Sequence, residues 1–266
     1  MPYLTRTGGR LSATEEGRLG IGVPGYAHPL LAPVEWAELT RPGTPLHWAV
    51  LNVADGPGDR PDPHCLAAAG RLTNAGSRVL GHLDLAYGAR PAGELDSDAR
   101  RFFDWYRVDG FFLDRCPAGR ADLPAMRRTT AALGAVLDDG FLVLGHGVHP
   151  YPGYAEAADQ LVTFRGRWAD YRWSQAAAWT ADHPPERFAH LVHGVPRGHL
   201  EEAMRIARWQ GAGTIFFTDR TDGTDRTDRT DVSEGGVAPV GRTRAFETLP
   251  GFWDEIVSRV GPGVLE

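Results

Sequence analysis

The sequence contains eight short apolar segments rich in Val, Leu and Phe, and each of them ends at or near a Gly, Pro, His or Asp. Stretches with helical character separate most of these segments. This alternation indicates strand-helix units and a parallel sheet, because parallel neighbouring strands need a crossover connection. We predict strands at residues 19–26, 47–54, 78–86, 108–114, 141–147, 160–166, 188–195 and 213–219.

Helices are expected between the strands, although the connections after strands one, five and six are less regular. Eight strand-helix units in 266 residues match a (β/α)₈ TIM barrel of the α/β class, with its active site at the carboxyl ends of the strands. An open doubly wound sheet is the alternative, but "GVPGYAHP" (22–29) lacks the G-x-G-x-x-G turn. We therefore predict a single TIM-barrel domain over residues 1–266, with helices at 64–76, 95–107, 123–139, 199–211 and 251–261.

The charge pattern excludes several classes of protein. The formal net charge of −6 is mild, which argues against nucleic-acid binding. All basic residues are Arg, so lysine Schiff-base chemistry is excluded. No apolar run reaches about 18 residues, so no membrane span is expected. The N-terminal segment has no apolar core of a secretory signal, which predicts a cytoplasmic protein unless a leader has been removed.

One segment is of low complexity. "TDRTDGTDRTDRTD" (218–231) repeats Thr, Asp and Arg, and we expect residues 218–235 to form an exposed loop within the barrel domain. Its arginines and its missing terminal Glu disfavour a calcium loop. Cys65 and Cys116 are expected to be free thiols. No C-x-x-C, H-x-H or H-E-x-x-H motif is present, so neither a metal nor a cofactor is expected.

Polar side chains follow the predicted strands and would meet at one face of the barrel. Carboxylates, imidazoles and aromatic rings gathered there suit a polar ligand with a flat ring face, such as a sugar. A histidine at a strand end is also a common hydrogen-bonding partner of a loop, which is the alternative for His82, His146 and His193. The residues at the predicted mouth are Tyr26, His28, Asn52, Asp55, His82, Asp84, Tyr87, Arg90, Asp114, Arg115, His146, His149, Arg165, Asp170, Tyr171, His193, Thr218 and Asp219.

Asp114 is the strongest candidate for a catalytic residue. It follows the apolar residues of "VDGFFLDRCP" (108–117), where a carboxylate is costly to desolvate unless it is paired or used. The alternative is a structural salt bridge to Arg115 or to another arginine. Further along, the Trp and Tyr residues of "RGRWADYRW" (165–173) would either stack on a sugar ring or pack at the rim.

Four segments, in this order and spacing, resemble the spherulin-4 family, also called spherulation-specific family 4. They are "GIGVPGYAHP", "VLNVADGPGD", "VLGHLDLAYGAR" and "WYRVDGFFLDR". The family includes (β/α)₈-barrel glycoside hydrolases that act on galactosaminogalactan-type polysaccharides. The resemblance implies a hydrolase-type cleft at the mouth, an oligo- or polysaccharide ligand that contains amino sugars or anionic groups, and no cofactor.

The resemblance also implies an Asp-Glu pair after the fourth strand and a Glu after the sixth. Asp114 matches the first of these acids, whereas the two glutamate positions hold Arg115 and Arg165. Glycoside hydrolysis needs two carboxyls, one protonated and one ionised. An arginine can neither give up a proton nor attack, and two arginines nearby would hold Asp114 ionised.

Several functions stay open on the sequence alone. In a hydrolase with relocated acids, Asp114 would pair with Asp84, or else with Asp55, Asp170 or Asp219, at about 5 to 9.5 Å. In a non-catalytic carbohydrate-binding barrel, the same residues would only bind. Alternatively, Arg115 and Arg165 would bind a carboxylate or phosphate on the sugar, or the cleft would have no activity left. We predict Asp114 and Asp84 as the catalytic pair; the oligomeric state is not indicated.

Overall fold

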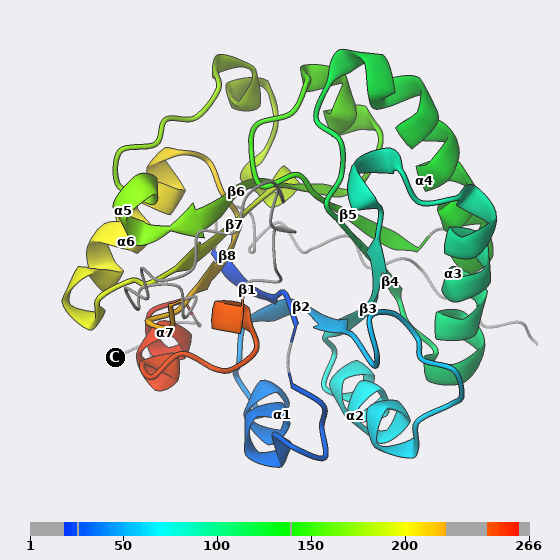
Figure 1. Cartoon of the computed structure of the whole chain (residues 1–266). Coiled ribbons are helices and arrows are strands. Elements are labelled where there is room, and N and C mark those ends of the chain that lie inside the picture. Colours follow the sequence, from blue (N-terminus) through cyan, green and yellow to red (C-terminus); the bar gives the residue numbers. More distant parts are fainter. Residues whose placement is uncertain (1–18, 26, 139, 222–243, 261–266) are drawn as a thin grey trace, which may run out of the picture.

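Eight parallel strands form a closed barrel in sequence order, from β1 next to β2 round to β8 next to β1. The structure is a computed structural model and describes residues 19–25, 27–138, 140–221 and 244–260. The predicted single (β/α)₈ barrel of the α/β class is confirmed (Figure 1). The strands are β1 (Gly20–Val23), β2 (Leu46–Leu51), β3 (Arg78–Asp84), β4 (Gly110–Asp114), β5 (Phe141–Gly145), β6 (Gln160–Arg167), β7 (Phe188–His193) and β8 (Thr214–Phe217).

Helices surround the strands on the outside of the barrel (Figure 1). The five predicted helices are present. Of the three connections expected to be less regular, the one after β1 contains a short α-helix at Pro33–Leu39, whereas those after β5 and β6 are irregular. Between β5 and β6 the chain makes only a 3₁₀ helix, at Pro152–Glu156. The α-helices are α1 (Pro33–Leu39), α2 (Pro63–Asn74), α3 (Ala92–Tyr106), α4 (Leu123–Leu137), α5 (Trp168–Tyr171), α6 (Leu200–Trp209) and α7 (Trp253–Val260).

The predicted boundaries are wrong by a few residues at several elements. α3 begins at Ala92 rather than at residue 95, because its first turn is exposed and has no apolar periodicity to mark it. β1 ends at Val23 rather than at residue 26. The next residue, Pro24, has no N–H with which to continue the ladder. Most of the low-complexity loop expected at 218–235 lies outside the described residues.

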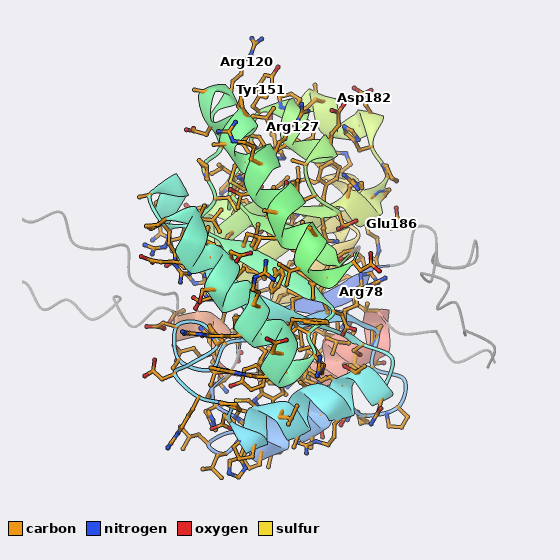
Figure 2. The ribbon with its side chains drawn as sticks, turned by 90° about the vertical axis from the view of Figure 1, so that its right-hand side faces the viewer. Arg78, Arg120, Arg127, Tyr151, Asp182 and Glu186 are labelled. Atoms are coloured by element: carbon orange, nitrogen blue, oxygen red, sulfur yellow. The ribbon has the colours of Figure 1, made fainter. Side chains whose placement is uncertain are left out.

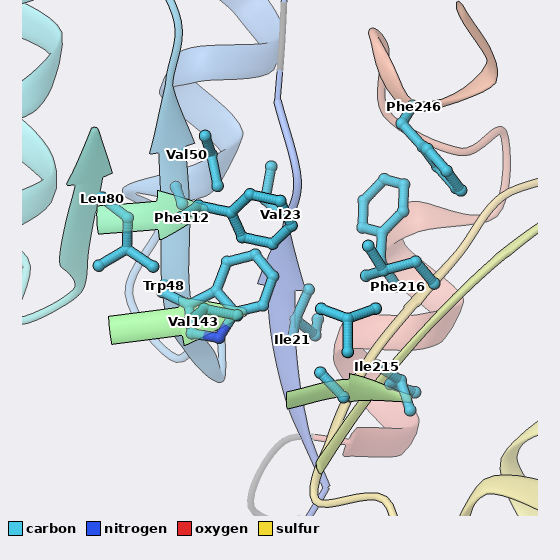
Figure 3. Close-up of a cluster of buried hydrophobic side chains, with 14 of the residues drawn as sticks. Ile21, Val23, Trp48, Val50, Leu80, Phe112, Val143, Ile215, Phe216 and Phe246 are labelled. Carbon is cyan, nitrogen blue, oxygen red and sulfur yellow. The ribbon is translucent and has the colours of Figure 1, made fainter. Parts of the chain in front are cut away.

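Large apolar side chains fill the barrel interior (Figure 3). Trp48 and Phe112 are fully or almost fully buried, and their rings pack at 5.7 Å between centroids. The Trp48 indole N–H donates to Gln160 Oε1 at 2.7 Å, and Gln160 Nε2 donates to Thr214 Oγ1 at 2.9 Å. These hydrogen bonds satisfy the buried polar groups of Trp48, Gln160 and Thr214 within the apolar core, and they fix the positions of these three side chains.

The outer face over α3 and α4 is polar (Figure 2). Arg127 pairs with Glu156 at 2.8 Å, and the Arg120 guanidinium lies 5.4 Å from the centre of the Tyr151 ring. In the part of the chain that the structure describes, no helix has the length and apolar character needed to cross a membrane.

Candidate functional site

The carboxyl ends of β3, β4 and β6 bring Asp84, Asp114 and Arg165 to the mouth of the barrel. Asp84 and Asp114 are register partners at the last positions of neighbouring strands. Two cavities of about 440 and 520 Å³ adjoin there, and both are lined by Asp114 and Arg165. A larger, more open hollow of about 800 Å³ lies between α4 and the segment after β5, and none of these mouth residues lines it. The mouth is therefore the candidate site.

Asp114 is partly buried, with its side chain 15% exposed, and accepts several hydrogen bonds. Its Oδ1 accepts from Arg165 Nη1 at 2.6 Å and from the Arg115 backbone N–H at 2.9 Å. Its Oδ2 lies 3.4 Å from His82 Nε2. Burial by itself raises the pKa of Asp114, but the His82 hydrogen bond, the Arg165 charge and the Arg115 N–H outweigh it and hold that pKa well below its ordinary value. Asp114 is therefore a fixed anion.

Arg165 belongs to β6, two strands away from Asp114, and reaches it across β5. The residue of β5 beside this contact is Gly145. A Cβ at position 145 would lie 3.3 Å from Asp114 Oδ1 and 3.0 Å from the Leu113 carbonyl oxygen. The missing side chain thus leaves space beside the Asp114 carboxylate.

Asp84 forms a second ion pair, with Arg115. Arg115 Nε donates to Asp84 Oδ1 at 2.8 Å, and its Nη2 donates to Oδ2, which makes the pair bidentate. The Ala86 N–H also donates to Asp84 Oδ1, at 2.8 Å. Burial acts to raise the pKa of Asp84, but these donors and the Arg115 charge lower it overall. Arg115 itself has a left-handed φ of 51°, a conformation that is uncommon outside glycine.

Each carboxylate of the predicted catalytic pair is thus neutralised by one arginine. The alternative of a salt bridge at Asp114 is confirmed, and its side-chain partner is Arg165. Arg115 contacts Asp114 only through its backbone N–H and gives its guanidinium to Asp84. With both pKa values lowered, both acids are ionised at neutral pH.

The chain matches spherulation-specific family 4 over residues 20–259. It belongs to this family. Spherulin-4 from Physarum polycephalum is 22% identical over 220 residues, which cover 79% of this chain and 66% of that protein. A crystal structure of Aspergillus clavatus Sph3 in complex with GalNAc superposes with a TM-score of 0.73 at 22% identity, covering 91% of this chain and 97% of that one. At this identity the structural likeness establishes a shared fold.

In this spherulation-specific family 4 barrel, most of the residues predicted for the site line the two mouth cavities. Asn52 also accepts the Gly56 N–H at 3.1 Å and so shapes the turn that carries Asp55. Asp55 is exposed, has a left-handed φ of 57° and lines both cavities. The predicted residues that line at least one of the two cavities are His28, Asn52, Asp55, His82, Asp84, Tyr87, Asp114, Arg115, His146, Arg165 and His193.

Other predicted residues have different surroundings. Asp170 accepts from Arg167 Nε at 3.1 Å, and Asp219 accepts the Gly251 N–H at 2.9 Å. Neither aspartate lines the two mouth cavities. Tyr171 is buried, and its hydroxyl is 2.8 Å from His190 Nδ1. Tyr26 lies outside the described residues.

The histidines of the mouth differ in their surroundings. His82 is 7% exposed and contacts Asp114, so it supports the carboxylate. His146 packs edge-on against Tyr154 at 4.8 Å, and burial lowers its pKa to about 4. His146 is therefore neutral at pH 7. His193 packs edge-on against Phe246 at 5.8 Å.

Phe246 is a site residue that sequence reasoning missed. It follows the low-complexity segment, far from any predicted strand end, yet its ring lies 5.4 Å from the Arg165 guanidinium carbon and lines one mouth cavity. The Ala27 N–H donates to the Glu247 carbonyl at 3.0 Å, which ties this segment to the loop after β1. A single Phe at the end of a three-residue 3₁₀ helix carries no periodic signal that would have placed it here.

Proposed function

We propose that the mouth of this barrel binds an oligosaccharide that contains amino sugars, and that Asp114 and Asp84 hold the ligand rather than hydrolyse it. The observation that carries the proposal is the pairing of each carboxylate with an arginine, at Arg165 and Arg115. Two ionised carboxylates can accept hydrogen bonds from sugar hydroxyls and amides. They cannot supply the protonated acid that glycoside hydrolysis requires.

The dimensions and lining of the mouth support a saccharide. Its two cavities, about 440 and 520 Å³, fall within the roughly 300–1,000 Å³ typical of small-ligand sites. Tyr87 is 57% exposed at one of them and offers an aromatic face. The complex of the related Sph3 barrel with GalNAc makes an N-acetylated hexosamine the first ligand to test.

A second candidate function is hydrolysis with Asp55 as the acid. Asp55 is exposed after β2 and lines both cavities together with Asp114. In this arrangement Asp114 would be the ionised carboxylate and Asp55 the proton donor, which requires a bound ligand to desolvate Asp55 and so raise its pKa. This candidate needs no change in the two ion pairs.

Binding and hydrolysis are separated by one set of measurements. GalNAc and oligomers of galactosamine and N-acetylgalactosamine are titrated into the protein by calorimetry, and the release of new reducing ends is followed in parallel. We expect binding without turnover, weakened at least about tenfold in Asp114→Asn, which corresponds to about 1.4 kcal/mol. The matched control is Asp170→Asn, another Asp paired with an Arg but outside the mouth cavities, and it should bind like the wild type.

The alternative outcomes are distinct. Turnover that Asp55→Asn abolishes would establish the hydrolase. Turnover that survives in Asp55→Asn but is lost in both Asp84→Asn and Asp114→Asn would return the chemistry to the predicted pair. If neither binding nor turnover is detected with any of these sugars, both functions are rejected for this ligand class.

A further inference from the structure

His28, Asp62 and Cys65 come together at the side of the mouth. His28 lies in the loop after β1 and lines one mouth cavity, whereas Asp62 and Cys65 begin α2. In the part of the chain that the structure describes, this is the one group of three or more His, Cys, Asp or Glu residues whose ligand atoms cluster closely enough to share an ion. We propose that these three side chains form a zinc-binding site.

The spacing of the ligand atoms fits zinc. The His28 ring nitrogen, the Asp62 oxygen and the Cys65 sulfur all lie within 4.8 Å of one another. Three atoms this close share a point no more than about 2.8 Å from each, whereas zinc binds N, O and S at about 2.0–2.3 Å. Shifts of well under an ångström would therefore complete three bonds, and a tetrahedral ion would keep one position for water.

The surroundings already orient the Asp62 carboxylate. Its Oδ1 accepts the backbone N–H groups of His64 and Cys65 at 2.8 and 2.9 Å, which leaves Oδ2 facing His28 Nε2 at 3.2 Å. The Asp62 N–H in turn donates to the Tyr106 hydroxyl, at 3.1 Å. Ligands held by such outer contacts bind metals more tightly than free side chains do.

Accessibility differs among the three ligands. Cys65 is fully buried, but the side chains of His28 and Asp62 are 24% and 28% exposed, so an ion can enter from their side. Burial and the adjacent Asp62 carboxylate raise the pKa of the Cys65 thiol to about 12. Without a metal, Cys65 is therefore a neutral thiol. The positive end of the α2 dipole favours its anionic form once a cation is present.

Binding would rearrange two protons. The Leu30 N–H donates to His28 Nδ1 at 3.2 Å, which places the imidazole proton on Nε2, facing Asp62. As zinc binds, the Cys65 S–H bond breaks and its proton passes to solvent while the zinc–sulfur bond forms. The His28 proton moves from Nε2 to Nδ1 through solvent, and the exposed Leu30 contact opens. The net change is one proton released per zinc.

The test uses the full chain after reduction and removal of metals with a chelator. Co²⁺ is titrated first, because a cobalt–thiolate bond gives a near-ultraviolet charge-transfer band, and Zn²⁺ is then added to displace it. We expect one Co²⁺ per chain, a thiolate band that Cys65→Ala removes, and one proton released into weak buffer. Affinity should fall at least tenfold in His28→Ala and in Asp62→Asn, which keeps a residue able to cap α2.

His64→Ala is the matched control, because His64 neighbours the site but is not one of its three ligands, and it should bind as the wild type does. Added Zn²⁺ should also raise the melting temperature of the wild type but not that of the His28→Ala variant. Absence of the thiolate band in the wild type, or a band that persists in Cys65→Ala, would overturn the proposal. A metal affinity equal to that of the wild type in either His28→Ala or Asp62→Asn would overturn it as well.

Discussion

The partner of Asp114 illustrates how single residues determine this mouth. Arg115 is its neighbour in sequence, yet the guanidinium that meets the Asp114 carboxylate comes from Arg165, two strands away. Arg115, the residue directly after β4, has a left-handed φ of 51° and binds Asp84 instead. Gly145, on the intervening strand β5, leaves space beside the Asp114 carboxylate. The two ion pairs therefore run between strands and hold β3, β4 and β6 in fixed positions at the mouth.

Replacing Arg165 should destabilise the fold. Arg165→Met leaves the largely desolvated Asp114 carboxylate without its nearest charge, and we expect a loss of about 3 kcal/mol in the free energy of unfolding. Urea denaturation measures this loss. Arg167→Met is the control, because the Arg167–Asp170 pair is exposed on both sides, and such pairs contribute about 0–1 kcal/mol. A double variant with Asp114→Asn should recover part of the loss, and simple additivity would contradict the pairing.

Asp114 should also make the fold sensitive to acid. Its pKa is lower in the folded than in the unfolded chain, where an aspartate titrates near about 3.9. Its stabilising contribution is therefore complete above that pH and is lost as the pH falls below it. Melting temperatures between about pH 5 and 3 should fall less steeply in Asp114→Asn than in the wild type. Parallel curves would show that Asp114 is not stabilised as an anion.

At the site, the sequence predicted which residues lie at the mouth, but it did not predict which of them contact one another. Asp84, Asp114 and Arg165 were identifiable because each follows an apolar strand, and parallel strand ends meet at one mouth. Which acid pairs with which arginine depends on strand stagger and on the bare backbone at Gly145, which no local pattern encodes. The cluster of His28 with Asp62 and Cys65 was missed for a similar reason. Its members come from the loop after β1 and from the start of α2, and they form no contiguous metal-binding motif.

Among the elements, the strands were predicted well because each is a short apolar run bounded by turn residues. The least predictable elements lie between β5 and β7, where α5 has only four residues and 3₁₀ turns replace the usual helices. Their side chains pack through individual contacts, such as the Tyr171 hydroxyl with His190. Contacts of this kind have no sequence period, so only a structure reveals them.

Alanine substitutions at two glycines, Gly110 of β4 and Gly134 of α4, test how tightly these neighbouring elements are packed. A Cβ at Gly110, the first residue of β4, would lie 1.9 Å from the Phe141 carbonyl oxygen of β5, so Gly110→Ala should prevent native folding or cost several kcal/mol. Gly134, within α4, has no atom within 4 Å of such a Cβ. Gly134→Ala should therefore raise stability, by about 0.5–1 kcal/mol. Chemical denaturation of both variants measures the contrast, and a stable Gly110→Ala barrel would contradict the strand register.

At the scale of the whole molecule, we propose that the barrel unfolds as one domain, because its closed sheet leaves no strand pair to separate alone.

Two histidines that the fold keeps neutral, His146 and His190, should determine the pH at which acid begins to lower the stability of the barrel. Burial lowers the pKa of His146 to about 4 and that of His190 to about 3, below the unfolded value of about 6.5. Below about pH 6.5 the unfolded chain takes up protons at these histidines and the folded chain does not. The free energy of unfolding is therefore highest above about pH 6.5 and falls as the pH drops toward the folded pKa values.

The expected result is a steady decline in melting temperature from about pH 6.5 downwards, before the aspartates titrate. Far- and near-ultraviolet circular dichroism should report the same midpoint at each pH if the chain is one cooperative unit. His146→Gln should flatten the part of the decline between about pH 6.5 and 4. An unchanged slope in that variant would show that His146 is not held neutral by the fold.

The pairing of Asp84 with Arg115 and of Asp114 with Arg165 also determines which ligands the mouth can attract from a distance. Each pair is a dipole with no net charge, so its field fades quickly and neither draws in nor repels ions in solution. A neutral sugar would gain its hydrogen bonds from these four groups without any counterion being displaced. Its affinity should then be nearly the same in dilute buffer and in molar salt.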